Sequence, residues 1–388
     1  LSVRATYRKE SKRERVKDIF AYYSEDSTAL FNGIQWVEAD LNDVPKLSLA
    51  FQDITHVYHC AALISFDPSD YKLLRKTNIR GTANIVNLCI NHAVEKLCYV
   101  STIATLGYDA DCIDEETYWD GNQNQSVYAI SKYGAEMEVW RGIQEGVSTV
   151  IVNPGVVLGP GFWSSGSGLL FDLVKKGTPF VTEGGTGYVA VQDVVTAMVR
   201  LMNTSIENQR YILTNGHHSY FEIISMISRE LNAKLPKKMS SSFWLAIAWR
   251  VDWIASKLFR RKRRLTRQLS YTLQKKSYYR ADKIKQDLDS YGKVLEAVTK
   301  IGKALAQINA PNPRRVYESV FRSEDRDDIT LVYPFKTFTR FSNSNGLPKG
   351  FQAEYDKING PGAFRKDVGD VLSKYTNGWH DEVLMLVE

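Results

Sequence analysis

The chain has 388 residues, 44% of them hydrophobic and 24% charged, which is the balance of soluble globular proteins. At about 150 residues per domain this length predicts two to three domains, and the apolar content excludes a mostly disordered chain. The 50 basic and 44 acidic residues leave a net charge of +6, an excess too small to indicate a nucleic-acid partner.

The cysteines and the apolar segments limit which chemistry and which cellular location we expect. All four cysteines lie between residues 60 and 112 without a metal-ligand spacing, so we expect neither a disulfide framework nor a metal site. The longest apolar segment, Phe243–Trp249, is far shorter than the roughly 18 residues of a membrane span. Because no apolar leader opens the chain, we expect a cytoplasmic protein.

Short β-branched segments alternate with longer helical patterns from residue 1 to about residue 200. The predicted strands are Leu1–Tyr7, Ile34–Ala39, Thr55–Cys60, Lys96–Ser101 and Ser148–Asn153. The predicted helices are Arg13–Tyr23, Val44–Phe51, Lys72–Asn91 and Val127–Glu145. Such alternation predicts an α/β fold with a doubly wound parallel sheet, whose ligand crevice lies at the carboxyl ends of the strands.

Beyond about residue 200 the pattern is mainly helical, and it changes again after residue 305. The Pro- and Asn-rich segment Asn309–Pro313 is typical of a linker. We therefore expect domains at 1–305 and 306–388, with a boundary about twenty residues earlier as the alternative. The second domain has the pattern of a small antiparallel α+β fold. Its predicted elements are the strands Arg315–Phe321, Asp328–Phe335 and Glu382–Val387 and the helices Phe351–Lys357 and Ala363–Tyr375.

The clearest candidate for chemistry is a tyrosine and a lysine four residues apart, Tyr128 and Lys132, in a helical pattern. This spacing places both on one helix face. An ammonium beside a phenol lowers the tyrosine pKa from about 10, which makes the tyrosine a general acid or base. Two further pairs repeat the spacing in a basic region, where a solvated helix face is the better interpretation: Tyr271 with Lys275, and Tyr279 with Lys283.

The motifs around this pair follow a definite order. A strand ending in Ser101-Thr102 precedes the pair, a strand ending in Asn153-Pro154 follows it, and His59-Cys-Ala-Ala62 lies upstream. In this order the motifs resemble the extended short-chain dehydrogenase/reductase family, the NAD(P)-dependent epimerase/dehydratase group, and within it the dihydroflavonol-reductase and 3β-hydroxysteroid-dehydrogenase-like branch. The resemblance covers about residues 1–305. It implies a Rossmann-like fold with substrate contacts mainly from 160–190 and 200–285.

The resemblance gives each matching position a role. Tyr128 is the catalytic acid or base, Lys132 lowers its pKa and holds the nicotinamide ribose, and Thr102 binds the substrate oxygen. The other implied cofactor contacts are Asp40, Leu41, Ala61, Ala62, Asn153 and Pro154. The helix residue Asn78 takes a structural role. His59, at a strand end, fits a buried core residue better than a catalyst.

Arg8 indicates which cofactor is bound. It follows the first predicted strand, where an arginine accommodates the 2′-phosphate of NADP and an acidic residue would bind the ribose hydroxyl of NAD. We therefore expect NADP, with NAD as the alternative. The family's glycine-rich phosphate loop has no counterpart before Gly33, so we expect an N-terminally truncated sequence.

Three functions stay open on these residues. The first is the interconversion of a carbonyl and an alcohol by hydride transfer, with Tyr128 moving the proton. The second is nucleotide-sugar epimerisation at the same site, whereas dehydration is disfavoured because Asp-Glu does not follow Thr102. The third is a non-catalytic dimeric binding protein with a degraded cofactor site. Aromatic residues in the expected substrate segments favour a small hydrophobic substrate: Phe162, Trp163, Phe171, Phe243 and Trp244.

Two further features concern partners. Residues 306–388 loosely resemble the ferredoxin-like dimeric α+β barrel modules of the antibiotic-monooxygenase type, on the strand Ile329–Phe335 and the final strand, which implies a homodimer. Trp379 and His380 are the candidate pocket residues there. Residues 243–267 join three tryptophans to the basic run 260–264, and peripheral membrane contact is the alternative to a solvated helix.

Overall fold

The computed structural model describes residues 2–107, 112–121, 125–161, 166–177, 180–236, 238–239, 242–259, 263 and 265–289, together with short pieces between 315 and 361. It divides into two compact units, residues 1–202 with 207–283, and residues 203–206 with 284–388. The predicted boundary at 305/306 lies outside the described residues and stays a prediction.

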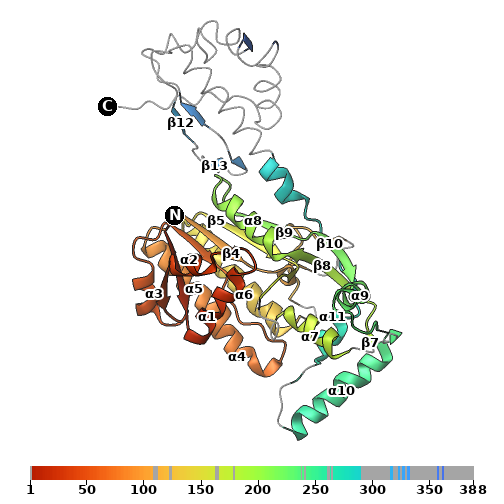
Figure 1. The fold of residues 1–388 in the computed structure, drawn as a ribbon. Coiled ribbons are helices and arrows are strands. Elements are labelled where there is room, and N and C mark those ends of the chain that lie inside the picture. Colours follow the sequence, from red (N-terminus) through yellow and green to blue (C-terminus); the bar gives the residue numbers. More distant parts are fainter. Residues whose placement is uncertain are drawn as a thin grey trace, which may run out of the picture. The chain divides into compact units, whose positions relative to one another are not determined.

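Parallel strands form the centre of the first unit (Figure 1). Strands β3 (His56–His59), β4 (Lys96–Val100), β5 (Thr149–Pro154) and β9 (Gln209–Leu213) lie in the order β3-β4-β5-β9, and every neighbouring pair is parallel. Strands β1 (Val3–Tyr7) and β2 (Ile34–Glu38) form a separate parallel pair. This arrangement confirms the predicted Rossmann-like α/β fold.

The strands are parallel because helices connect them in sequence. Helices α1 (Glu10–Phe20) and α2 (Ser27–Asn32) lie between β1 and β2, α3 (Val44–Ala50) lies between β2 and β3, and α6 (Val127–Gln144) lies between β4 and β5. All but α2 are predicted from the sequence. Asp26 begins α2, because its side chain accepts a hydrogen bond from the Ala29 amide at 2.9 Å.

The main core lies between these helices and the sheet. Leu97 and Tyr99 of β4 and Ile151 of β5 are buried against apolar side chains of α3, α5 (Gly81–Asn91) and α6. Gly142 allows α5 and α6 to approach closely, because a Cβ atom at this position would lie 2.5 Å from Cγ1 of Val86. Helix α8 (Val191–Met202) packs on β4 and β5.

The predicted helix at 72–91 is present as three consecutive helical pieces. These are α4 (Tyr71–Leu74), a π-helical segment η2 (Arg75–Arg80) and α5. The buried Asn78 lies in the π-helical segment, where it bonds both the amide and the carbonyl of Leu63 and donates to the Ser131 hydroxyl. Asn78 thus ties the segment after β3 to α6, which is the structural role expected of it.

A second group of strands lies beyond β5. Strands β6 (Val156–Leu158), β8 (Gly185–Ala190) and β10 (Gly216–Ser219) form a three-stranded sheet, and β7 (Phe180–Val181) pairs with β11 (Lys238–Met239). The helices here are α7 (Gly168–Lys176), α9 (Tyr220–Glu230), α10 (Ser242–Leu258) and α11 (Arg267–Thr272). The expectation of mainly helical structure beyond residue 200 was therefore incomplete, because β9 and β10 were missed.

In the second unit the structure describes two short antiparallel pairs. Strand β12 (Arg315–Tyr317) pairs with β15 (Thr330–Val332), and β13 (Arg322–Ser323) pairs with β14 (Arg326–Asp327). The strands predicted at 315–321 and 328–335 are therefore present in part. The predicted strand Glu382–Val387, and the candidates Trp379 and His380, lie outside the described residues.

Candidate active site

The site candidates follow the carboxyl ends of successive strands. Arg8 comes directly after β1, Asp40 after β2, Ala61 after β3 and Thr102 after β4, while Asn153 lies near the end of β5. Since β3, β4 and β5 are parallel neighbours, the last three candidates share one edge of the central sheet. This edge is where ligands bind in doubly wound folds.

The two candidates for the adenosine end of a dinucleotide are neighbours. Nη1 of Arg8 lies 3.4 Å from Oδ2 of Asp40, and both side chains are partly exposed. The pKa of Asp40 is lowered first by the backbone amide of Asn42, which donates to Oδ1 at 2.8 Å, and less by Arg8. The carbonyl of Leu41, beside Asp40, accepts from Asn84 at 2.8 Å. A carboxylate and an exposed guanidinium therefore stand together at the ends of β1 and β2.

Ala61 and Ala62 are exposed at the end of β3. Side chains this small leave the backbone open to close approach by a planar or phosphorylated ligand. The same small and exposed surface is what a dinucleotide would require here, so the residues present fit the implied cofactor.

Tyr128 lies in the first turn of α6. The helix begins here because the hydroxyl of Ser126 accepts a hydrogen bond from the Ala129 amide at 3.1 Å. The tyrosine ring contacts Phe66 edge to face, with ring centroids 5.7 Å apart. Burial raises the pKa of Tyr128 to about 12, so its phenol is protonated at neutral pH.

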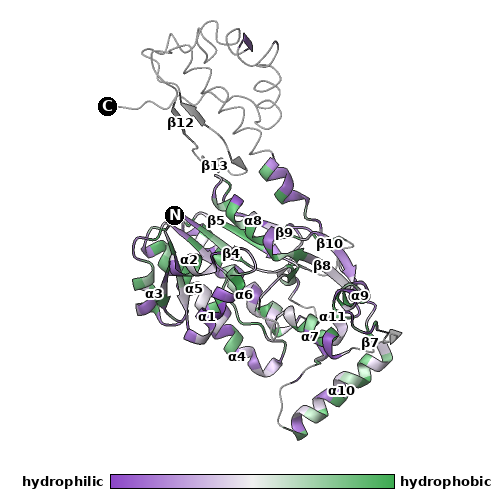
Figure 2. Ribbon diagram, viewed as in Figure 1, coloured by the Kyte–Doolittle hydropathy of each residue, from purple (hydrophilic) through white to green (hydrophobic). Residues whose placement is uncertain are grey.

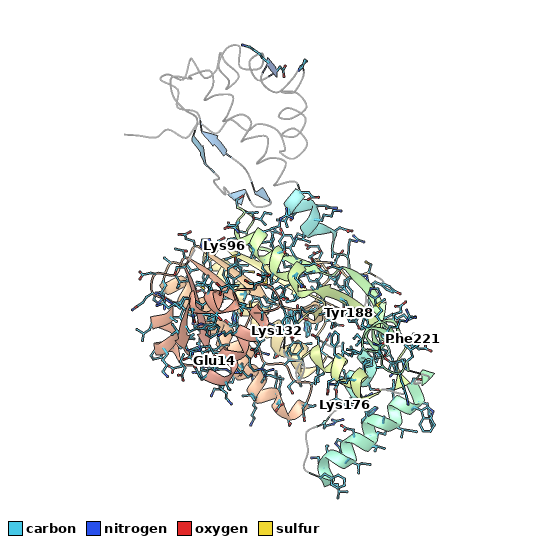
Figure 3. All side chains as sticks on the ribbon, viewed as in Figure 1. Glu14, Lys96, Lys132, Lys176, Tyr188 and Phe221 are labelled. Atoms are coloured by element: carbon cyan, nitrogen blue, oxygen red, sulfur yellow. The ribbon has the colours of Figure 1, made fainter. Side chains whose placement is uncertain are left out.

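Lys132 lies one turn along the same face and is 2% exposed, in the interior of the first unit (Figure 3). Its Nζ donates to the Tyr99 hydroxyl at 2.6 Å and to the Val100 carbonyl at 2.9 Å. Burial lowers the pKa of Lys132 to about 7, although the Glu136 carboxylate acts in the opposite direction. The ammonium is therefore fixed at the carboxyl end of β4.

One expectation for this pair is wrong. Lys132 was expected to lower the pKa of Tyr128, but the pKa is raised, and burial is the cause. The spacing of four residues fixes the helix face but not the direction of a flexible four-carbon side chain. The Lys132 side chain reaches to β4, where Tyr99 and Val100 accept its hydrogen bonds.

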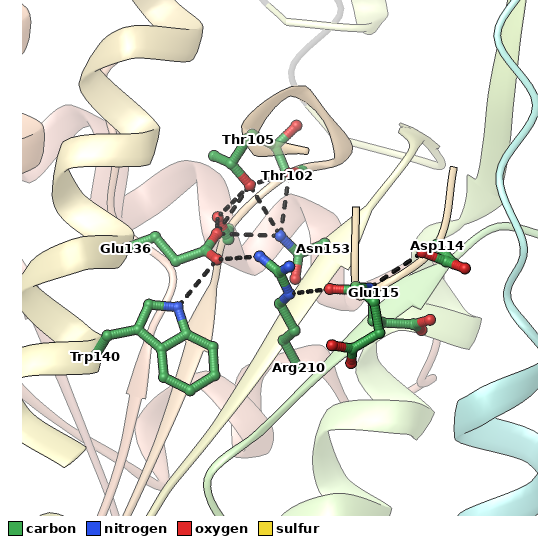
Figure 4. A network of polar contacts seen from close by, with 10 residues as sticks. Thr102, Thr105, Asp114, Glu115, Glu136, Trp140, Asn153 and Arg210 are labelled. Atoms are coloured by element: carbon green, nitrogen blue, oxygen red, sulfur yellow. Dashed lines mark hydrogen bonds and ion pairs between the residues drawn. The ribbon is translucent and has the colours of Figure 1, made fainter. Parts of the chain in front are cut away.

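Thr102 is held by its own backbone and by its neighbours (Figure 4). Its carbonyl accepts from Oγ1 of Thr105 at 2.8 Å and from Nδ2 of Asn153 at 3.2 Å. Its Oγ1 accepts from the Ala104 amide at 3.3 Å, at the start of the short helix η3 (Ile103–Thr105). Among the residues that the structure describes, no hydrogen bond uses the Thr102 hydroxyl proton, so this hydroxyl can still donate a hydrogen bond.

A buried carboxylate that the sequence analysis missed organises this edge of the sheet. Glu136 is fully buried, and its two oxygens accept hydrogen bonds from the residue that follows β4 and from η3, α6, β5 and β9 (Figure 4). The donors are Ser101 at 2.5 Å, Thr105 at 2.8 Å, Asn153 at 3.1 Å, Trp140 at 3.3 Å and Arg210 at 3.4 Å. The available signal was the spacing, because Glu136 lies four residues beyond Lys132 on the same helix face.

His59 is a core residue, as its position in a strand predicts. Its Nε2 lies 2.9 Å from Oγ1 of Thr82, and its ring centroid is 5.4 Å from that of Tyr99. Burial, and secondly the charge of Lys132, lower its pKa to about 3. The imidazole is therefore neutral throughout the physiological range.

The other tyrosine–lysine pairs lack this setting. Tyr271 is 55% exposed near the end of α11, and Lys275 follows the helix. Tyr279 is buried and stacks on His217, which differs from the expected solvated face, while Lys283 donates to Gln209 at 2.6 Å. Neither pair follows a strand of the central sheet, so we interpret both pairs as structural.

The aromatic residues expected to favour a hydrophobic substrate are dispersed. Phe171 of α7 packs against a buried cluster that includes Val174 and Ile223. Phe243 and Trp244 are exposed on α10 at 66% and 64%. These three side chains do not form one enclosed wall, and Phe162 and Trp163 lie outside the described residues.

The described residues contain no group of three or more His, Cys, Asp or Glu side chains that could hold a metal ion. The four cysteines are free thiols. No helix in the described ranges is long and apolar enough to cross a bilayer.

The parallel sheet and the polar residues at its carboxyl edge define a dinucleotide-binding domain of the Rossmann type. The chain belongs to the NAD dependent epimerase/dehydratase family, whose model matches residues 2–213, more than half of the chain. A nicotinamide dinucleotide, NAD or NADP, is the cofactor of this family.

Among similar proteins, a candidate dihydroflavonol 4-reductase of Synechocystis sp. is 28% identical over 235 residues, which are 58% of this chain and 67% of that protein. Cinnamoyl-CoA reductase 1 of Petunia hybrida is 24% identical over 204 residues, 50% of this chain and 60% of that protein. The chain thus spans about two thirds or less of the length of these relatives.

Solved structures share the fold. The crystal structure of gox2253 has a TM-score of 0.60 and 24% identity, and the match covers 75% of this chain and 93% of that one. A UDP-glucose 4-epimerase of Thermotoga maritima has a TM-score of 0.55 and 15% identity, and the match covers 74% of this chain and 92% of that one.

Proposed function

We propose that this protein is an NADP(H)-preferring oxidoreductase that interconverts a carbonyl and an alcohol. One observation carries the proposal. Tyr128 and Lys132 share a face of α6. The Lys132 ammonium donates to Tyr99 and to Val100, the last residue of β4, and Val100 lies two residues before Thr102. The similarity to proteins named as dihydroflavonol 4-reductase and cinnamoyl-CoA reductase is consistent with a reductase.

The proposed mechanism assigns each group one task. When bound, NADPH supplies the hydride that reaches the carbonyl carbon. Tyr128, protonated because its pKa is about 12, donates its proton to the oxygen as negative charge develops there. Thr102 donates a hydrogen bond to the same oxygen, and Lys132 holds the ribose hydroxyls.

The proposed cofactor contacts are, besides Tyr128 and Lys132, the residues Arg8, Asp40, Leu41, Ala61, Ala62, Asn153 and Pro154. Arg8 supports NADP, because its exposed guanidinium can meet a 2′-phosphate beside Asp40. Asn153 is fully buried among the Thr102 and Glu136 contacts, so it would act by fixing the end of β5. Arg8→Ala should weaken NADPH binding about tenfold to a hundredfold and leave NADH binding unchanged.

The test is a titration with NADPH and with NADH, followed by nicotinamide fluorescence, and then turnover with hydrophobic aldehydes and ketones. Tyr128→Phe should abolish turnover and leave the Kd for NADPH nearly unchanged. Tyr271→Phe is the matched control, since this tyrosine has the same spacing to a lysine, and it should behave as the wild type.

Each contrary result points to one alternative. Turnover retained in Tyr128→Phe would remove this tyrosine from the mechanism. A product formed without net consumption of NADPH would indicate an epimerase. A folded chain that binds neither dinucleotide would indicate the non-catalytic binding protein.

The proposal extends to the substrate and the assembly. A small hydrophobic substrate would contact segments within 160–190 and 200–285, and the domain at 306–388 would hold two chains in a homodimer. Sedimentation of the full chain and of residues 1–305 would test the second part, because the shorter chain should be monomeric.

A further inference from the structure

Helix α10 (Ser242–Leu258) differs from the other helices of the first unit, because its apolar side chains face outward. Figure 1 shows α10 standing apart from the sheets, and in Figure 2 most of it has the white and green of neutral and hydrophobic residues. Only Leu245 and Asp252 are buried. Asp252 accepts a hydrogen bond from the Leu265 amide at 3.1 Å, which fixes the inner face of the helix.

The large exposed apolar side chains of α10, apart from Trp253, form one continuous face. At 3.6 residues per turn these side chains span an arc of roughly 100°. We call this the α10 apolar face, and its six members are between 38% and 73% exposed: Phe243, Trp244, Ile247, Val251, Ile254 and Leu258. A contiguous exposed patch of this kind marks an interaction site in a soluble protein.

Basic residues border this face. Lys257 and Arg250 are both exposed and lie along the same edge of the face, and the Arg250 guanidinium is 4.4 Å from the Trp249 ring centroid. In sequence, Leu258 and Phe259 are followed at once by the basic run 260–264, five consecutive Lys or Arg residues. Between residues 257 and 264 six residues are basic and none is acidic.

We propose that α10 and the basic run bind the surface of an anionic lipid bilayer, with the α10 apolar face in the headgroup region. A helix with one apolar face, tryptophan near the boundary and Lys or Arg at its edges is the pattern of an interfacial helix. The alternative occupant is a second copy of this chain. The only acidic residue of α10 is Asp252, which is buried and bonded to Leu265, so a second α10 offers no charge complementary to the basic run, whereas anionic lipid does.

The test is cosedimentation with lipid vesicles in the absence of dinucleotide and substrate, so its result does not depend on the proposed reductase activity. The wild type should bind vesicles with about one third phosphatidylserine, bind phosphatidylcholine vesicles far less, and lose binding as salt rises. Tryptophan emission should shift to the blue on binding, and Trp244→Phe should reduce the shift.

Four variants separate the contributions. Val251→Glu and Ile254→Glu, each at an exposed position, should each lower the partition coefficient at least tenfold. Replacing basic-run residues by glutamine should lower it about fivefold per charge. Leu49→Glu, which changes a 62% exposed leucine of α3, is the control and should bind as the wild type.

Three results would overturn the proposal. Two of them are a wild type that stays in the supernatant with both kinds of vesicle, and variants of the α10 apolar face that bind as strongly as the wild type. The other is a dimer, measured by light scattering, that Val251→Glu dissociates while vesicle binding is absent, which would show that a second copy covers this face.

Discussion

Acidification should destabilise this fold through one buried imidazole. His59 is 4% exposed, and its Nε2 lies 2.9 Å from Oγ1 of Thr82. Burial, with the charge of Lys132 as the second cause, lowers the pKa of His59 from 6.5 to about 3. Below pH 6.5 the unfolded chain therefore binds a proton at this position that the folded chain does not bind until about pH 3.

The size of the effect follows from these two pKa values. The unfolded state binds more protons between pH 6.5 and 3, so the free energy of unfolding falls as the pH falls, by about 1.4 kcal/mol per unit. His59 alone should therefore lower this free energy by about 2 kcal/mol at pH 5 and by about 3 kcal/mol at pH 4, relative to pH 8. The loss is complete only below the folded pKa.

The assay is urea unfolding of the wild type and of His59→Gln at pH 8, 6, 5 and 4. His59→Gln has its own cost at pH 8, but its curve against pH should lack the His59 contribution. The difference between the two proteins should thus change by about 2 kcal/mol between pH 8 and pH 5. His56→Gln, an exposed histidine of the same strand, is the control and should follow the wild type. Parallel curves for His59→Gln and the wild type would refute the reasoning and show that water reaches this imidazole.

Two other buried groups, Lys132 and Glu136, give predictions about stability. The pKa of Lys132 is about 7 in the folded chain against 10.5 unfolded, so wild-type stability should rise by about 2.3 kcal/mol from pH 7 to pH 9 through this group. Lys132→Met should lack this rise, and urea unfolding at the two pH values measures it. Glu136→Gln should destabilise by about 3 kcal/mol, because it removes the charge to which the surrounding donors point. Thermal unfolding tests this, with Glu138→Gln as the control, since that partly exposed ion pair with Arg141 contributes about 0–1 kcal/mol.

The sequence predicts the first unit well because its strands are buried on both sides. Strands β4 and β5 are continuous apolar segments flanked by helices, and their bounds differ by one residue or so from those expected. Strand β10 could not be found this way. Its four residues, Gly216–Ser219, show no apolar alternation, and the strand exists because it pairs with β8.

The π-helical segment within 72–91 is a second case in which contacts distant in sequence determine the local structure. A helical pattern predicts a continuous α-helix here, but Asn78 bonds Leu63 and Ser131, which come from two other segments. Those contacts fix Asn78 within the widened turn. No local pattern encodes partners that lie 15 and 53 residues away.

The sequence predicted which residues belong to the candidate site but not how their side chains are arranged. Residue types at the strand ends indicated Tyr128, Lys132 and Thr102. The Glu136 contacts were missed because Arg210 comes from β9, 74 residues farther along the chain, and the pairing of β9 with β5 has no signal in the sequence near Glu136. The direction of the Lys132 side chain depends likewise on Tyr99, across the helix–sheet interface.

Two kinds of buried polar group meet at this edge of the sheet, and the difference between them bears on function. Glu136 is buried with five donors around its oxygens, so its contacts stabilise the fold. Lys132, Tyr128 and His59 are instead shifted by burial toward their neutral forms, which costs stability at pH values where water would favour the charged form. A fold selected for stability alone has no need for a buried lysine where an apolar side chain would pack. Three such shifts gather around Tyr99 of β4, and perturbed groups of this kind are concentrated at functional sites, which supports the proposed chemistry at this edge independently of family resemblance.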